Sequence, residues 1–323
     1  MNALKNRALS WGAFLLVLSA AAGAQTFPSK PITLIVPQAT GGANDVIARA
    51  LANKLGNRLG QPLVVENKPG AGGNVGTSLV ARAPNDGHTL MLTAQSAQTI
   101  NPALYRKIPF DPVKDFVPIM TIATAPYVLA VNPSLPVKTV PELISYARAN
   151  PNKLNAASAG NGTVNHLLIE MLKSAEGIQI AHIPYKGVAA AATDLVGGQV
   201  QMSFGSLAGM LPFIRGGQVR PLGVVTAQRL ALLPDLPTMA ETVPGLHVNA
   251  WYGLFAPAGT PKAVITRIHA EINEVLQTQD MKDFMQSQGA IVSSSTPEEL
   301  AKLVTDDLVR WSKIVKDANA QID

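Results

Sequence analysis

Cysteine is absent from the 323 residues of this chain, and its absence removes several chemistries at once. The protein can form no disulfide, can carry no lipid-modified N-terminal cysteine, and has no thiolate to act as a nucleophile or metal ligand. Aromatic residues are also scarce, at 5% of the chain, and the lysines and arginines form no basic run. We therefore predict no nucleic-acid partner, because such partners are bound by clustered cations and stacking rings.

Apolar runs long enough to span a bilayer are also lacking, since the longest one, from Trp11 to Ala22, is too short. Lys5 and Arg7 precede that run, and the small residues at 22–24 follow it. This is the pattern of a cleavable signal peptide. We predict a signal over residues 1–24, cleavage near Ala24/Gln25, and a periplasmic location. Loss of the two cations lowers the formal net charge from +5 to +3.

Signatures of catalysis are incomplete. The loop at 70–76 has Val75 where a dinucleotide fingerprint requires glycine, and the segment 204–209 has Phe204 where a nucleophile elbow requires glycine. The histidines are far apart in the sequence and show no metal-ligand spacing. They are His88, His166, His182, His247 and His269. We predict neither an enzyme nor a cofactor or metal site.

Two glycine-rich turns are the strongest positive feature. Residues 37–45 and 158–166 each follow a strand-like run and open a helical one. Such a junction points free backbone N–H groups and the positive end of a helix dipole at one place, which favours an anion. Glycines 41, 42, 160 and 162 are expected to let these N–H groups approach an oxygen, and Asp45 to cap its helix or orient the loop. One turn in each half predicts a cleft that holds a small acid from both sides.

Strands alternate with helices along the whole mature chain, which predicts an α/β fold with mainly parallel sheets. A proline-rich stretch at 101–118 leads to a strand at 127–131, where a second series of alternations begins. The strand at 250–256 is expected to return the chain, and two long helices after it are expected to pack on the first domain. We predict domain 1 at 25–124 plus 248–323, domain 2 at 125–247, and a two-strand hinge.

Seven segments together resemble the tripartite tricarboxylate transporter substrate-binding proteins, also called Bug receptors. The resemblance covers essentially the whole mature chain and rests on motifs of high specificity. The segments are PITLIVP at 31–37 with Gly41, Gly42 and Asp45, VENKPGAGGN at 65–74, YRKIPFDPVKDF at 105–116, VNPSLPVK at 131–138, ASAGNGT at 157–163, HIPYKG at 182–187 and WYGLFAPAGTP at 251–261.

This resemblance implies a type II-like periplasmic clamshell that captures a carboxylate and delivers it to small and large membrane permease subunits, or to a sensor kinase. The turns would bind one carboxylate through backbone amides and ordered waters. Gln38, Asn44, His88 and the pair Gly205 and Ser206 depart from the usual family residues, so the ligand stays open among di- and tricarboxylates, aromatic acids and amino acids. The predicted ligand-binding residues are Gln38, Thr40, Gly41, Gly42, Ala43, Asn44, Asp45, Ser96, Ser158, Ala159, Gly160, Asn161, Gly162, Thr163, His166, Tyr185, Lys186, Gly205 and Ser206.

Two other functions stay open at this point. The chain could sense a ligand for a two-component kinase, and adjacent genes would separate sensing from transport. It could also be a periplasmic enzyme acting on a carboxylated substrate, which a turnover assay would reveal. We expect a monomer in either case.

Overall fold

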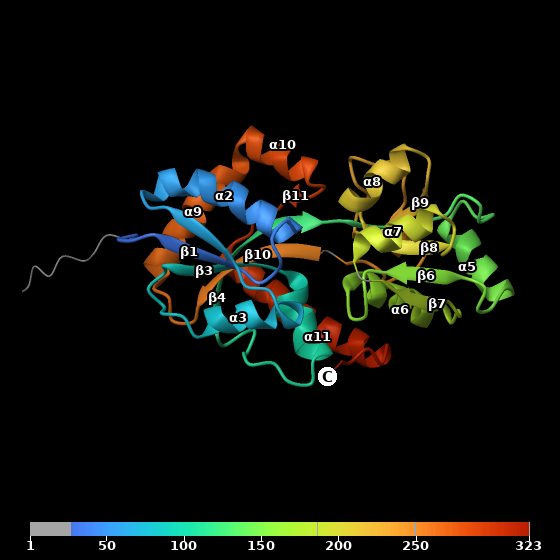
Figure 1. Cartoon of the computed structure of the whole chain (residues 1–323), viewed down its shortest axis with the longest axis horizontal. Coiled ribbons are helices and arrows are strands. Elements are labelled where there is room, and N and C mark those ends of the chain that lie inside the picture. Colours follow the sequence, from blue (N-terminus) through green and yellow to red (C-terminus); the bar gives the residue numbers. More distant parts are fainter. Residues whose placement is uncertain (1–26, 186, 249, 323) are drawn as a thin grey trace, which may run out of the picture.

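The computed structural model describes residues 27–185, 187–248 and 250–322, so the predicted signal peptide and Lys186 lie outside the described residues. The chain forms two lobes side by side, each built on one sheet (Figure 1). Within the described ranges, no helix combines the length and apolarity needed to cross a membrane.

The first lobe contains a six-stranded sheet. Its strands are β1 (Ile32–Val36), β2 (Leu63–Asn67), β3 (Thr89–Ala94), β4 (Phe116–Ala125), β10 (Ala250–Pro257) and β11 (Ile291–Val292), and its helical segments are α2 (Ala43–Leu59), η1 (Ala71–Gly73), α3 (Asn74–Ala81), η2 (Ser96–Ile100), α4 (Asn101–Leu104), α9 (Lys262–Gln277), α10 (Gln279–Ser287) and α11 (Pro297–Asp317). The spatial order of the strands is β11-β4-β10-β3-β1-β2.

The second lobe contains a five-stranded sheet. Its strands are β5 (Tyr127–Val131), β6 (Asn155–Ser158), β7 (Ala181–Pro184), β8 (Met202–Ser206) and β9 (Arg220–Val224), and its helical segments are α5 (Val140–Ala149), α6 (Val164–Glu176), α7 (Val188–Val196), α8 (Leu207–Arg215) and η3 (Met239–Glu241). The spatial order is β7-β6-β8-β5-β9.

Both sheets are mixed, which corrects the prediction of mainly parallel sheets. In the first lobe β10 is antiparallel to both β3 and β4, and in the second lobe β5 is antiparallel to both β8 and β9. These two strands each carry the chain into a lobe from the other one, so they enter the sheet from the opposite end. Apart from β11, the two sheets therefore have the same strand order, with β1 equivalent to β6 and β3 equivalent to β8.

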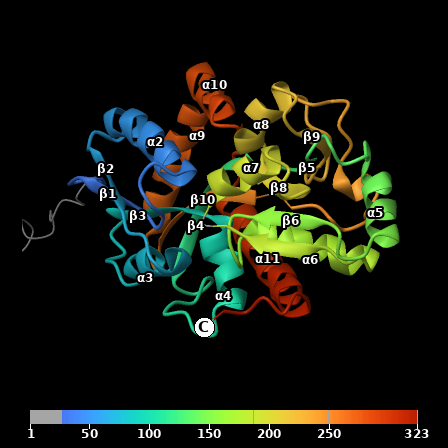
Figure 2. The same ribbon diagram turned by 45° about the vertical axis from the view of Figure 1, so that its right-hand side comes forward.

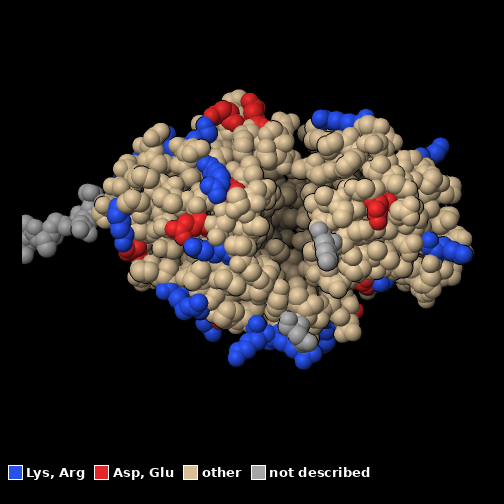
Figure 3. All heavy atoms as spheres, in the orientation of Figure 1, with Lys and Arg blue, Asp and Glu red and all other residues tan. Residues whose placement is uncertain are grey.

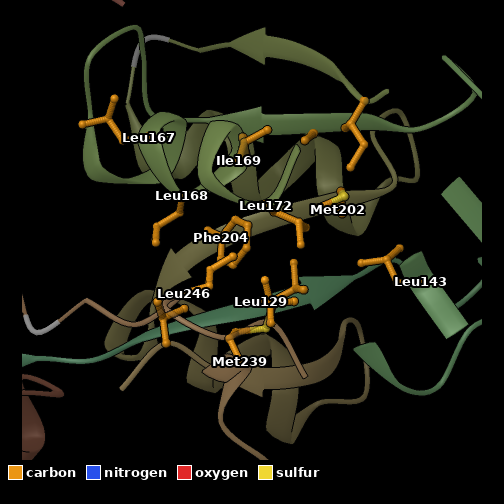
Figure 4. Close-up of a cluster of buried hydrophobic side chains, with 14 of the residues drawn as sticks. Leu129, Leu143, Leu167, Leu168, Ile169, Leu172, Met202, Phe204, Met239 and Leu246 are labelled. Carbon is orange, nitrogen blue, oxygen red and sulfur yellow. The ribbon is translucent and has the colours of Figure 1, made fainter. Parts of the chain in front are cut away.

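Each lobe is filled by a hydrophobic core whose residues follow the periodicity of its elements. In the first lobe α2 buries Ile47, Leu51 and Leu55, which recur every fourth residue on one face. In the second lobe, side chains from α6, β5, β8 and the segment 239–246 meet in one interior (Figure 4). Leu168, Leu172 and Phe204 are completely buried there.

The C-terminal helices do not all pack where the sequence predicted. Helix α9 packs against α2 in the first lobe, as expected. Helix α11 contacts β4 and α4 but continues to α6, and its Trp311 and Val315 join the core of the second lobe (Figure 2). Helix α11 begins with a capping box, since the Thr296 hydroxyl accepts from the Glu299 N–H and the Glu299 side chain accepts from the Thr296 N–H. Helix α9, in contrast, has no side-chain cap, and the hydroxyl of the nearby Thr260 donates to the Pro257 carbonyl.

Candidate functional site

The two glycine turns occupy equivalent positions in the two lobes. The first turn (residues 37–45) joins β1 to α2, and the second turn (residues 158–166) joins β6 to α6. Because β1 and β6 are equivalent strands, both turns leave the carboxyl end of a parallel strand, which is where open α/β sheets bind ligands. The first turns of α2 and α6 lie on either side of the space between the lobes (Figure 1). The space-filling view shows a deep groove there, with walls that carry few charged side chains on this face (Figure 3).

The first turn is braced by a buried carboxylate. The Gly41 N–H donates to Asp45 Oδ2 at 2.9 Å, and Arg49 Nη2 lies 2.9 Å from Asp45 Oδ1. Burial raises the pKa of Asp45, but the hydrogen bonds from Arg49 and Gly41 outweigh it and lower that pKa below its ordinary value. Asp45 is therefore ionised, its charge is balanced by Arg49, and it orients the loop as the sequence predicted.

Gln38 and Asn44 extend this network toward the groove. The Asn44 amide donates to Gln38 Oε1, and the Asn67 amide donates to the Gln38 carbonyl at 3.1 Å. Asn67 in turn accepts from Arg49 Nη2 at 3.0 Å. Gln38 Nε2 and Asn44 Oδ1 are enclosed, and neither has a hydrogen-bond partner within the described part of the chain. The amide side chains of the first turn thus have one hydrogen-bond donor and one acceptor without a partner among the described residues.

The second turn is braced without any charge. The Gly160 N–H donates to Ser158 Oγ at 3.1 Å, and Ser158 Oγ lies 2.6 Å from Nε2 of His182. Thr163 Oγ1 donates to the Gly160 carbonyl at 2.7 Å, and its oxygen accepts from the His166 N–H as the cap of α6. These bonds close the loop on itself.

Two stacked histidines support the second turn from below. The rings of His166 and His182 are nearly parallel, at 14°, with centroids 4.0 Å apart. Burial lowers the pKa of His166 and brings that of His182 down to about 4, so both rings are neutral at pH 7. Because the Gly162 N–H donates to His166 Nδ1 at 3.1 Å, the proton of neutral His166 is on Nε2. His166 thus holds the turn through Nδ1.

The N–H groups that remain for a ligand are those of the first helical residues. The first intrahelical hydrogen bonds run from Val46 to Gly42 and from Leu167 to Thr163. The N–H groups of the first two residues of each helix, Ala43 and Asn44 in α2 and Val164 and Asn165 in α6, precede these bonds and have no partner within their helix. Each lobe therefore offers a pair of donors at the positive end of a helix.

The glycines serve the turns differently from the expectation. The N–H groups of Gly41, Gly160 and Gly162 donate within their own turns instead of facing a ligand. Their φ angles of +83°, +134° and +72° lie where other residues rarely go, so these glycines provide conformation. A Cβ at Gly162 would also lie only 2.5 Å from Cδ2 of Leu104, because α4 of the first lobe packs on the second turn.

The remaining predicted residues are at the same edge of the sheets, and two of them, Tyr185 and Ser206, have hydrogen-bond partners within the protein. The Tyr185 hydroxyl donates to Asp194 Oδ2 at 2.6 Å, and this hydrogen bond, with burial, raises the pKa of Tyr185 to about 12. Ser206 Oγ caps α8 by accepting from the Gly209 N–H, and Gly205 is buried beside Met210. Ser96 is the first residue of η2, directly after β3. The side chains of Thr40 and Asn161 belong to exposed residues of the turns.

Sequence reasoning missed the supports of both turns, which are His182, Arg49 and Asn67. His182 lies in β7, where it pairs in register with Ala156, two residues before Ser158. Residues two apart share a face of a strand, so a parallel β6–β7 pair would have placed His182 beside Ser158. Arg49 follows Asp45 by one helical turn, which is an ion-pair spacing visible in the sequence.

Comparison with known proteins places the chain among binding proteins. Residues 47–320 match the model of the tripartite tricarboxylate transporter family receptor. A Rhodopseudomonas palustris protein with adipate is 35% identical and matches 92% of this chain and 100% of its own, with a TM-score of 0.79. The periplasmic binding protein BugD is 35% identical, with coverages of 91% and 99% and a TM-score of 0.76. MatC of the same Rhodopseudomonas, with bound malate, is 33% identical, with coverages of 90% and 100% and a TM-score of 0.75.

Proposed function

Because this chain belongs to the tripartite tricarboxylate transporter receptor family, we propose that it captures a small carboxylate between its lobes and delivers it to a tripartite-type membrane permease. The family and the two-lobed α/β binding-protein fold that the motifs predicted are confirmed. The chain is a periplasmic solute-binding protein and not an enzyme. The carboxylate class, the permease and the domain boundaries at 124/125 and 247/248 are parts of the proposal.

The proposal of a carboxylate ligand rests on two equivalent helix N-termini, one in each lobe. Four backbone N–H groups, of Ala43, Asn44, Val164 and Asn165, stand before the first intrahelical hydrogen bonds. A hydrogen bond to a charged group contributes about 1.5 to 3 kcal/mol. Four such hydrogen bonds together are comparable with the binding free energy of a micromolar complex, about 8 kcal/mol. No cationic side chain is needed for such a site.

The charges around the turns are compatible with an anion. Asp45 would repel a ligand carboxylate if it were free, but Arg49 balances its charge and Gly41 occupies Oδ2. The second turn is neutral, since both of its histidines are uncharged at pH 7. The relatives with adipate and malate favour a carboxylate as the ligand class.

Calorimetry on the mature protein tests this function. We expect one strong response in a panel of mono-, di- and tricarboxylates, aromatic acids and acidic amino acids, and none with neutral sugars. Mass spectrometry of the ligand retained during purification provides an independent identification. Binding of a neutral sugar in the absence of any carboxylate response would refute the carboxylate site.

Delivery to a permease needs a separate experiment. Cells that express the adjacent small and large membrane subunits should take up the labelled ligand only when this receptor is also present. The matched control is the same strain with the Gly160→Val receptor, which retains the surface of both lobes outside the turn. Equal uptake with and without the receptor, or a sensor kinase gene in place of the permease genes, would contradict delivery.

A further inference from the structure

A cavity of the second lobe lies beside the second turn. Its volume is about 330 Å³, and it lies between the N-terminal halves of α7 and α8. Apolar side chains form most of its wall, chiefly Val188, Ala191, Ala192, Met210 and Phe213. None of the described lining residues carries a charge.

The polar side chains in this wall are already hydrogen-bonded within the protein. Ser203 Oγ donates to the Ala157 carbonyl at 2.9 Å, and the Asn165 amide donates to the Phe204 carbonyl. Thr193 Oγ1 donates to the Ala189 carbonyl at 3.0 Å, and Ser206 Oγ accepts from the Gly209 N–H. An occupant would therefore meet mainly apolar side chains, which offer a charged group no hydrogen bond.

The cavity is bordered by two residues of the second turn. Asn165, whose backbone N–H is one of the four ligand donors, also lines the cavity, together with Ala159 of the same turn. A molecule that bonds to the Asn165 N–H can thus extend directly into the apolar space. The space is about twice the roughly 150 Å³ that holds a benzene molecule in a protein core.

We propose that this cavity receives the uncharged body of the ligand, so that the cognate ligand is a monocarboxylate with a compact apolar body, such as a phenyl ring or a chain of about six carbons. The inference rests on the proposed function, because it requires the carboxylate end to be held at the turns. It separates this receptor from one for di- or tricarboxylates, whose second charge would have to enter the apolar space. Val188, Ala192, Met210 and Phe213 are then the residues that select the ligand.

Calorimetry with hexanoate and adipate tests the proposal on the mature protein, since the two acids have equal chain length and differ in one terminal carboxylate. We expect hexanoate to bind at least about ten-fold more tightly than adipate. In the series from butyrate to hexanoate, each methylene should improve the affinity about four-fold, which corresponds to about 0.8 kcal/mol per buried CH₂.

Variants in α7 locate the effect in the cavity. Val188→Asp places a carboxylate at the wall, while Ala190→Asp places one on the same exposed helical turn but outside the cavity. Both substitutions suit the first turn of a helix, so both variants should fold. We expect Val188→Asp to weaken hexanoate binding at least ten-fold and Ala190→Asp to leave it within two-fold. Phe213→Ala should enlarge the cavity and shift the preference toward octanoate.

The possible results separate this inference from the proposed function. If adipate binds as tightly as hexanoate, or if Val188→Asp and Ala190→Asp behave alike, the cavity does not receive the ligand, although the receptor still binds carboxylates. If no acid of the series binds but another carboxylate of the wider panel does, this inference is wrong and the carboxylate function stands. If no carboxylate of that panel binds, the carboxylate function itself is wrong.

Discussion

The two turns of this protein have the same position and different supports. In the first lobe an ion pair between the buried Asp45 and the half-exposed Arg49 holds the loop before α2. In the second lobe Ser158, Thr163 and two neutral histidines hold the loop before α6. Both arrangements leave the first two helical N–H groups for a ligand, because both use side chains to bond the glycine N–H groups of the loop.

The two turns thus have the same backbone arrangement, and different kinds of side chain stabilise it. The proposed anion site would depend on that backbone geometry. The two supports should nevertheless respond differently to acid. The ion pair persists until Asp45 is protonated, below the ordinary carboxyl range, whereas the histidine pair is disturbed as soon as an imidazole gains a proton. The second lobe is therefore the acid-sensitive half of the site.

Valine substitutions in the turns should have the largest effect. Gly160→Val forces a β-branched residue to a φ of +134° and places Cβ 3.3 Å from the Tyr185 carbonyl. We expect loss of ligand binding and a free energy of unfolding lower by about 1 to 3 kcal/mol. Gly42 has a φ of −76° and only the Ala39 carbonyl near its Cβ position, at 3.4 Å. Gly42→Val should therefore keep its stability and still lose binding, and unchanged calorimetric affinity would remove the first turn from the site.

Substitution of Asp45, the charged residue that supports the first turn, should have a smaller effect than the valine substitutions. Asp45→Asn keeps an oxygen for the Gly41 N–H but loses the charge opposite Arg49, so we expect the free energy of unfolding at pH 7 to fall by about 1 kcal/mol. Because the pKa of Asp45 is lowered in the fold, its contribution is present above the ordinary carboxyl range and is lost as the pH falls through the folded value. The difference between wild type and variant should thus narrow near pH 3 in urea titrations.

Ser158→Ala is the matched variant in the uncharged turn. It removes the acceptor of the Gly160 N–H. The difference in the free energy of unfolding between wild type and this variant should not narrow near pH 3. Parallel acid dependence of the two variants would contradict the difference between the supports.

Acid should weaken the second turn through His182. Burial brings the pKa of His182 to about 4, below its ordinary 6.5, so the neutral ring is the form that the fold stabilises. Its contribution is complete above pH 6.5 and is lost as the pH falls toward 4. We expect ligand affinity and melting temperature to decline over this interval, and His182→Gln to flatten the decline. His269→Gln, outside the site, serves as the control, and an equal flattening by it would exclude His182 as the cause.

The smallest change in stability is expected for substitution of Asp307 in α11, which is away from both turns. Its Oδ2 accepts from Trp251 Nε1 at 2.8 Å, and burial raises the pKa of Asp307. A raised carboxyl pKa means that ionisation costs stability as the pH rises above the ordinary value. Asp307→Asn can keep an acceptor for Trp251 without that cost, so stability at pH 7 should stay within about 1 kcal/mol of wild type or rise. Loss of ligand binding in this variant would show that α11 acts on the site.

Local sequence was sufficient for several elements. The strand predicted at 127–131 is β5, and the return strand predicted at 250–256 is β10 less its last residue. Strand β4 was missed because Pro118 lies within it. Proline is tolerated there since β11 pairs with β4 only at Ala123 and Thr124, so that Pro118 is on an open edge, next to an irregularity in the pairing with β10. The sequence of β4 alone does not show that Pro118 lies on an open edge of the sheet.

The amino-acid sequence by itself determined the family, the α/β alternation and the two glycine turns, because glycine spacing, apolar periodicity and helix caps are properties of short segments. Tertiary structure alone decided that the turns are equivalent, that His182 lies beneath Ser158, that Leu104 packs on Gly162, and that an apolar cavity adjoins Asn165. Each of these depends on which distant strands pair and on the direction in which β5 and β10 cross between the lobes. Such pairings are set by the packing of whole lobes, so no local pattern records them.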